Sequence, residues 1–175
     1  NGEYDLPLNS AEVSLYGLKM SDYGLSSDYM IVEGGLLGIK KDFIEDGAER
    51  IYNKEQAADG EYFVRLKEGK EIHQSNPAEG GVEYIVKIKM KAVEPESTGQ
   101  IIIEYRDQEY RNEISNSRKI FSFNLDSEWR EYSAKIKAPD NQIPANPSFD
   151  VWQIRVRLKC ESGAIDVDDV RLSHL

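Results

Sequence analysis

The segment from Val151 to Cys160 alternates between apolar and polar residues without a break. Its even-numbered residues are Trp, Ile, Val, Leu and Cys, and the odd-numbered ones after Val151 are Gln, Arg, Arg and Lys. A period of two with one apolar face predicts a half-buried antiparallel strand. The turn residues Glu161-Ser162-Gly163 follow, and then a second apolar-polar run over 164–172. Together the two runs predict a strand, a turn and a second strand.

The second run changes phase halfway along. Ile165 and Val167 alternate, but the next apolar residues are Val170 and Leu172, so the pattern slips by one residue. Such a slip predicts a β-bulge at Asp168 and Asp169. Two carboxylates at a bulge near a strand end either bind a cation or are simply solvated there, and the spacing alone favours neither.

Similar strand patterns recur along the chain with turn residues between them. The predicted strands cover 62–67, 84–91, 101–107, 119–125 and 129–136. Segments 69–81 and 108–119 are predicted to be polar loops, and 43–53 is ambiguous, with weak helical spacing. No strong amphipathic helix separates the strands. This pattern predicts an all-β sandwich that forms one domain over residues 1–175.

The composition excludes several classes of protein. A net charge of -10 makes nucleic-acid binding unfavourable, because the phosphate backbone would be repelled. The single Cys160 excludes an internal disulfide, and no zinc motif or catalytic nucleophile motif is present. No apolar run approaches the length of a membrane span, and we recognise no signal peptide. The sequence therefore predicts a non-catalytic protein without a membrane span.

Five segments in order resemble the carbohydrate-binding modules of the jelly-roll, galactose-binding-like type, in particular families four, nine and twenty-two. The segments are NGEYD at 1–5, AADGEYFVRL at 57–66, GVEYIVKIKMKA at 81–92, SEWREYSAKIKAP at 127–139 and IDVDDVRL at 165–172. The resemblance implies a jelly-roll β-sandwich of two antiparallel sheets that binds a polysaccharide or oligosaccharide. It also implies a monomeric module of a secreted or cell-surface glycan-degrading enzyme, fused to a catalytic domain.

The resemblance further implies a structural calcium site that joins the first strand to the last. Carried over residue by residue, its ligands are Asp5 and either Asp168 or Asp169. Calcium prefers several oxygen ligands, and a bound ion here would tie down both ends of the chain.

In a jelly roll of this type the strands at 84–91, 101–107 and 151–160 are expected to lie in one sheet. The outward residues of these strands are mainly basic: Lys87, Lys89, Arg106, Arg155 and Arg157, with Gln153 and Glu104 among them. Because arginine presents a planar fork that matches carboxylates and sulfates, this face predicts an acidic polysaccharide as the ligand. The alternative is that these side chains only cover apolar surface and discourage edge pairing, with Glu104 paired to them.

Tyrosines off the core face are the other candidate ligand-binding residues, since a flat aromatic ring can stack on a sugar ring. They are Tyr23, Tyr29 and Tyr52, together with Tyr16 and Tyr110. Each could instead be a loop anchor. A second set is in phase with core residues and is predicted to pack: Tyr62, Tyr84, Tyr105, Tyr132 and Trp152.

Two other functions are consistent with the same fold. One is a structural spacer or accessory domain that binds no sugar. The other is a polysaccharide lyase or hydrolase, against which the near-absence of histidine counts, since only His73 and His174 are present.

Overall fold

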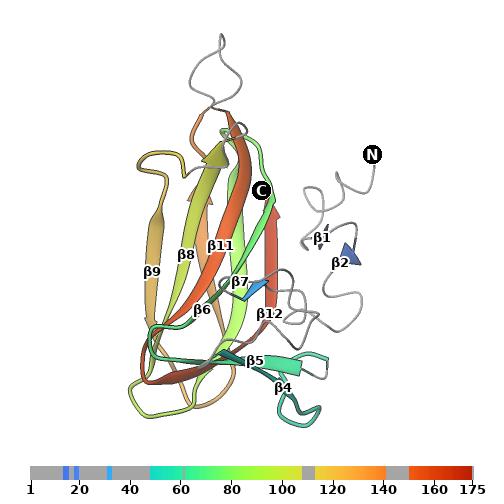
Figure 1. The fold of residues 1–175 in the computed structure, drawn as a ribbon, viewed down its shortest axis with the longest axis vertical. Coiled ribbons are helices and arrows are strands. Elements are labelled where there is room, and N and C mark those ends of the chain that lie inside the picture. The colour runs from blue at the N-terminus through green and yellow to red at the C-terminus, as the bar shows by residue number, and fades with distance from the viewer. Residues whose placement is uncertain are drawn as a thin grey trace.

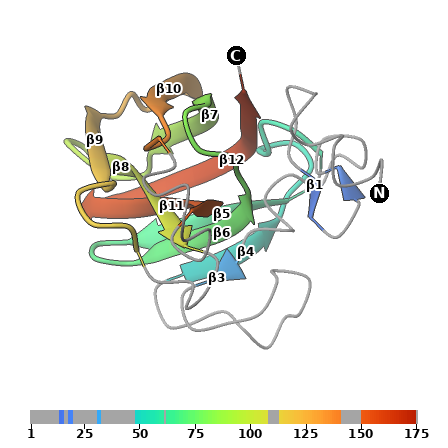
Figure 2. The same cartoon turned by 90° about the horizontal axis from the view of Figure 1, so that it is seen from above.

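The computed structural model describes residues 14–15, 18–19, 31–32, 48–60, 62–107, 113–140 and 150–174. Within these ranges the regular structure consists of β-strands, and no helix is present (Figure 1). Ten of the strands form two five-stranded antiparallel sheets that pack as a β-sandwich, seen from above in Figure 2. The predicted all-β sandwich is confirmed.

Sheet I has the order β10-β7-β12-β5-β4. Its strands are β10 (Arg130–Lys137), β7 (Glu83–Ala92), β12 (Ala164–His174), β5 (Tyr62–Lys67) and β4 (Ala48–Tyr52). Sheet II has the order β3-β6-β11-β8-β9. Its strands are β3 (Ile31–Val32), β6 (Glu71–Pro77), β11 (Val151–Ser162), β8 (Thr98–Asp107) and β9 (Lys119–Asn124). The short strands β1 (Ser14–Leu15) and β2 (Leu18–Lys19) pair with each other.

The core lies between the two sheets and is built from every second residue of the long strands. Ile88 and Met90 of β7 contribute from sheet I, and Ile101 of β8 with Ile154 and Leu158 of β11 from sheet II. All five side chains are fully buried. Interdigitation of two inner faces in this way is the usual core of a β-sandwich, and it confirms the alternation predicted in these strands.

The predicted bulge in the last strand is present. Asp168 of β12 pairs with Lys89 of β7, but the next pair is Arg171 with Lys87, so the register shifts between them. Asp169 has a positive φ of 47°, which turns the backbone within the bulge. The shift returns Val170 and Leu172 to the core.

A second bulge was not predicted. The register of β11 against β8 shifts between Val151 and Gln153, so Trp152 leaves the alternating pattern. Trp152 is 37% exposed, and its prediction as a packing residue is therefore wrong. Tyr84 and Tyr105, predicted by the same argument, are buried in the core.

Two stretches that the sequence did not predict as strands are strands. Segment 69–81, predicted to be a loop, contains β6, and the ambiguous segment 43–53 contains β4. β6 lacks alternation in polarity because its outward residues are polar and Asn76, on its inward side, is also polar and buried. Among the described residues, no helix is long and apolar enough to cross a membrane.

Candidate carbohydrate-binding face

Sheet II carries a group of charged and polar side chains on its outer face, which we call the arginine face. Cross-strand pairing places Arg155 of β11 between Ser75 of β6 and Glu104 of β8. Directly paired residues of an antiparallel ladder lie on the same face. The arginine face consists of Glu71, His73, Ser75, Glu104, Arg106, Arg118, Gln153, Arg155 and Arg157.

Glu104 lies at the centre of the arginine face and is fully buried. Its Oε1 atom accepts a hydrogen bond from Arg106 Nη2 at 2.8 Å, and its Oε2 atom accepts one from Arg118 Nη2 at 3.1 Å and one from Arg157 Nη1 at 3.5 Å. Burial alone would raise the pKa of Glu104, but the hydrogen bond from Arg106 and the charges of the three arginines hold that pKa below its usual value. Glu104 is therefore ionised and holds the arginines in place.

Arg157 is held by a second glutamate. Its Nε and Nη2 atoms donate to Glu71 Oε1 and Oε2, both at 2.9 Å. Burial acts to lower the pKa of Arg157, but the paired hydrogen bonds and the charge of Glu71 outweigh it, and the pKa is raised. This bidentate geometry uses most of the guanidinium, so Arg157 has a structural role on the face.

Arg155 is the arginine of the face whose charge is least compensated. Its Nε atom donates to the neutral Ser75 Oγ at 2.9 Å, and its ion pair with Glu104 is long, at 3.9 Å. Burial and the charge of Arg106 lower the pKa of Arg155 from its ordinary value. The serine fixes the orientation of the side chain without neutralising it.

His73 lies on the same face, opposite Arg157 in the β6–β11 ladder. Burial and the charges of Arg155, Arg157 and Arg106 lower the pKa of His73 to about 4, although Glu71 acts in the opposite direction. The imidazole is therefore neutral at pH 7. Sequence reasoning missed His73 as a site residue, because the strand that carries it was predicted to be a loop.

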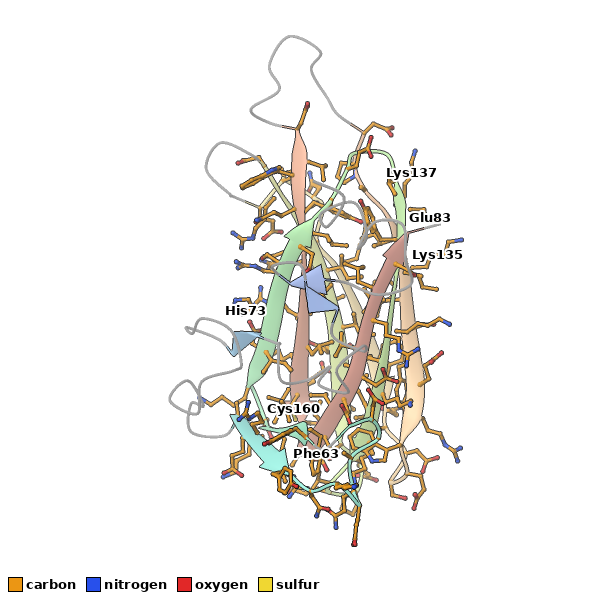
Figure 3. The ribbon with its side chains drawn as sticks, turned by 90° about the vertical axis from the view of Figure 1, so that its right-hand side faces the viewer. Phe63, His73, Glu83, Lys135, Lys137 and Cys160 are labelled. Atoms are coloured by element: carbon orange, nitrogen blue, oxygen red, sulfur yellow. The ribbon has the colours of Figure 1, made fainter. Side chains whose placement is uncertain are left out.

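The two lysines predicted to belong to this face do not lie on it. Lys87 and Lys89 are in β7, which belongs to sheet I, whereas β8 and β11 belong to sheet II. The expectation that the three strands share a sheet is wrong, because a period of two does not encode which strands become neighbours. On sheet I, Lys87 pairs with Glu131 at 3.6 Å and Lys89 with Asp169 at 3.0 Å. Figure 3 shows His73 and Lys135, a residue of β10 in sheet I, on opposite sides of the sandwich.

The loop before β5 is fixed against the outer face of sheet I. Asp168 Oδ2 accepts hydrogen bonds from the backbone N–H groups of Ala58 and Asp59, at 2.8 and 3.0 Å. The indole Nε1 of Trp129 donates to the carbonyl oxygen of Gln56 at 2.8 Å and its ring packs edge-on against Phe63. Phe63 is thus fully buried, although it points away from the core as the alternation predicts.

The described aspartates of the last strand do not by themselves fit a calcium site. Asp168 Oδ1 accepts from the backbone N–H of Asp169, so three N–H groups already donate to this carboxylate. Asp169 is paired with Arg171 at 2.7 Å and with Lys89 at 3.0 Å. The part of the chain that the structure describes holds no group of three His, Cys, Asp or Glu side chains suited to a metal. Asp5 lies outside the described residues, so the calcium site stays a prediction.

Tyr52 is the one candidate stacking tyrosine within the described residues, and it is 62% exposed at the end of β4. Its ring lies 5.1 Å from that of Tyr62, over which the guanidinium of Arg50 is placed at 4.7 Å. Because β4 is an edge strand of sheet I, Tyr52 does not belong to the arginine face. Tyr16, Tyr23, Tyr29 and Tyr110 lie outside the described residues.

No protein-family model and no curated protein matches this chain. Solved structures do match it. The CBM22-2 xylan-binding domain of Xyn10C from Paenibacillus barcinonensis is 12% identical, with a TM-score of 0.57 over 89% of this chain and 96% of that one. The CBM22-1–GH10 modules of a Clostridium thermocellum xylanase, Xyn10B, complexed with xylohexaose, are 19% identical, with a TM-score of 0.54 over 75% of this chain.

This chain covers 25% of the length of that two-module xylanase structure. A family 16 carbohydrate-binding module is 17% identical, with a TM-score of 0.50 over 72% of this chain and 84% of that one. At these identities the likeness concerns the fold. The chain has the jelly-roll β-sandwich fold of carbohydrate-binding modules.

Proposed function

We propose that this protein is a non-catalytic carbohydrate-binding module, and that the arginine face of sheet II binds an acidic polysaccharide. The fold supports the general part of the proposal, because the similar structures include several carbohydrate-binding modules. We infer further that the module belongs to a secreted or cell-surface enzyme that degrades glycans. Binding of the module would raise the enzyme's concentration at its polymer.

Arg155 carries the more specific part of the proposal. Its guanidinium is oriented by Ser75 and lacks a close carboxylate partner, on a face where Gln153 and His73 are neighbours. A planar guanidinium held in this way can donate paired hydrogen bonds to a uronate carboxylate or a sulfate. The other arginines of the face contribute positive charge but are held by Glu71 or Glu104.

Native affinity gels that contain polygalacturonate, a sulfated polysaccharide or neutral xylan test this proposal. We expect the acidic gels to retard the protein and the retardation to weaken as salt rises, since exposed ion pairs are screened. Arg155→Ala should weaken binding about two- to fivefold, which corresponds to an ion pair of up to about 1 kcal/mol.

Lys87→Ala is the matched control, because it removes one positive charge from the opposite sheet. We expect its retardation to equal that of the wild type. If both substitutions weaken binding equally, the protein responds to net charge and the arginine face is not the site. If neutral xylan binds equally at low and high salt, the ligand is not acidic, and the exposed Tyr52 becomes the better candidate.

One observation favours a second candidate function, a spacer domain that binds no sugar. Three of the four arginines are already engaged by Glu71 or Glu104, as in a purely structural network. Absence of retardation in every gel would favour this alternative.

A further inference from the structure

His73 and Arg155 are diagonal neighbours on the outer face of sheet II. In the β6–β11 ladder, His73 pairs with Arg157, and Arg155 pairs with Ser75 two residues further along β6. Diagonal neighbours of a ladder lie about 7–8 Å apart, which long side chains can span. One ligand group placed between the two residues would therefore contact both.

The charges around His73 come from three described strands. Glu71 lies on its own strand, Arg155 and Arg157 on β11, and Arg106 on β8. β3 pairs with His73 on its other side through Ile31, which carries no charge. Arg157 is balanced by Glu71, so the uncompensated positive charge near the imidazole is mainly that of Arg155.

We propose that His73 and Arg155 form one subsite for a carboxylate of an acidic polysaccharide, in which His73 takes up a proton when the ligand binds. This inference rests on the function proposed above. The ligand's carboxylate accepts hydrogen bonds from the guanidinium of Arg155 and from an imidazolium N–H of His73. The negative charge of the ligand offsets the arginine charges that, together with burial, keep the imidazole neutral in the free protein.

The direction of the pH dependence follows from this arrangement. In the free protein the pKa of His73 is about 4, so at pH 6 the imidazole is neutral. A bound carboxylate raises that pKa, because an opposite charge nearby favours the protonated form. Affinity therefore increases as pH falls from neutrality towards 4.5. A rise of one pKa unit would increase affinity by at most about tenfold.

Hexagalacturonate is a suitable probe, with xylohexaose as the neutral control. NMR of the imidazole Cε1–H resonances can follow both histidines of the chain, and His73→Gln assigns them. We expect His73 to titrate at a higher pH when hexagalacturonate is bound, and affinity at pH 4.5 to be several-fold higher than at pH 7.

His73→Gln should lose the increase in affinity at pH 4.5, because it removes the group that takes up the proton, while the ratio of its affinities at pH 4.5 and pH 7 stays close to one. His73→Asn provides a second neutral variant, and His174→Gln, which removes the only other histidine, should keep the increase. If the probe binds and the titration of His73 does not move, the inference is wrong while the proposed function stands. If the probe does not bind at either pH but a sulfated polysaccharide retards the protein, the inference is wrong and the proposed function stands; if no acidic polysaccharide binds, both are wrong.

Discussion

Glu104 is a fully buried carboxylate on the outer face of sheet II. It forms ion pairs with Arg106, Arg118 and Arg157. Glu104→Gln would leave these arginines close together without their common counter-charge. Because breaking a buried ion pair by removing one partner costs several kcal/mol, we expect a loss of about 3 kcal/mol in the free energy of unfolding, measured by urea denaturation.

Glu131→Gln is the matched control for this prediction. Glu131 pairs with Lys87 on the outer face of sheet I, and both side chains are about half exposed. Exposed pairs contribute little, so the control should lose less than about 1 kcal/mol. Similar losses in the two variants would mean that Glu104 does not organise the arginine face.

His73 also makes stability depend on pH. Its pKa is about 4 in the folded protein and about 6.5 in the unfolded chain, so the unfolded chain binds more protons between these values. The free energy of unfolding should therefore fall as pH decreases from about 6.5 to 4. Because the imidazole is only partly buried, we expect a contribution of about 1–2 kcal/mol after allowance for solvent screening.

Urea denaturation of the wild type and of His73→Gln at pH 7 and pH 5 measures this contribution. Between pH 7 and pH 5 the free energy of unfolding should fall more for the wild type than for His73→Gln. An unchanged difference would show that His73 is not held neutral by the fold.

At the residue scale, the sequence predicted correctly whether a side chain is buried where this depends only on the alternation within its own strand. The alternation in 84–91 predicted the buried Tyr84, Val86, Ile88 and Met90, and the phase slip predicted the bulge at Asp168 and Asp169. It failed for Trp152, because the bulge that exposes this side chain interrupts an alternation that appears continuous in the sequence.

At the scale of elements, the turns between strands offer a matched pair of glycines. Gly163 joins β11 to β12 at a φ of 73°, and Gly69 lies between β5 and β6 at a φ of 78°. A Cβ at Gly163 would collide with Ser97, whose hydroxyl accepts from Ala164 N–H and donates to the carbonyl oxygen of Glu94. A Cβ at Gly69 meets nothing within 4 Å.

Gly69→Ala should cost only the strain of a left-handed backbone, about 1 kcal/mol. Gly163→Ala should cost about 2 kcal/mol more, because the serine and its two hydrogen bonds must shift as well. Thermal denaturation of both variants compares them directly. Equal melting temperatures would mean that the turn moves away from Ser97 without cost.

The prediction of strands and sheets from the sequence failed where the outcome depends on contacts between residues that are distant in sequence. The predicted strands at 119–125 and 129–136 correspond to β9 and β10 within one or two residues. β6 was missed because polar residues lie on both of its sides. Those on its outer side, Ser75 and Glu71, bind Arg155 and Arg157, which are distant in sequence. Assignment of Lys87 and Lys89 to the arginine face failed for a related reason, since sheet order is a property of the whole fold.

At the scale of the whole molecule, the attachment of the loop at 53–60 to the last strand can be tested against the predicted calcium site. Asp168→Ala removes the acceptor for Ala58 N–H and Asp59 N–H, and we expect a loss of about 2 kcal/mol whether or not a chelator is present. If hydrogen bonds alone hold this loop, the wild type should melt at the same temperature in calcium-containing buffer with and without chelator.

The calcium site inferred from the resemblance predicts the opposite result. In that case the chelator lowers the melting temperature of the wild type, and Asp168→Ala abolishes the chelator effect. Differential scanning calorimetry of the two proteins with and without chelator therefore decides between attachment by hydrogen bonds alone and attachment by a metal.

The two longest strands, β11 and β12, occupy the middle of sheet II and the middle of sheet I. Among the described strands they are also the last two in sequence order, so they are synthesised after the other ten. While a ribosome is still translating the segment before Val151, β6 and β8 lack their shared neighbour, and so do β5 and β7. We therefore expect a nascent chain to leave both sheets open until β11 and β12 emerge, and to depend in that interval on chaperones that shield unpaired strand edges.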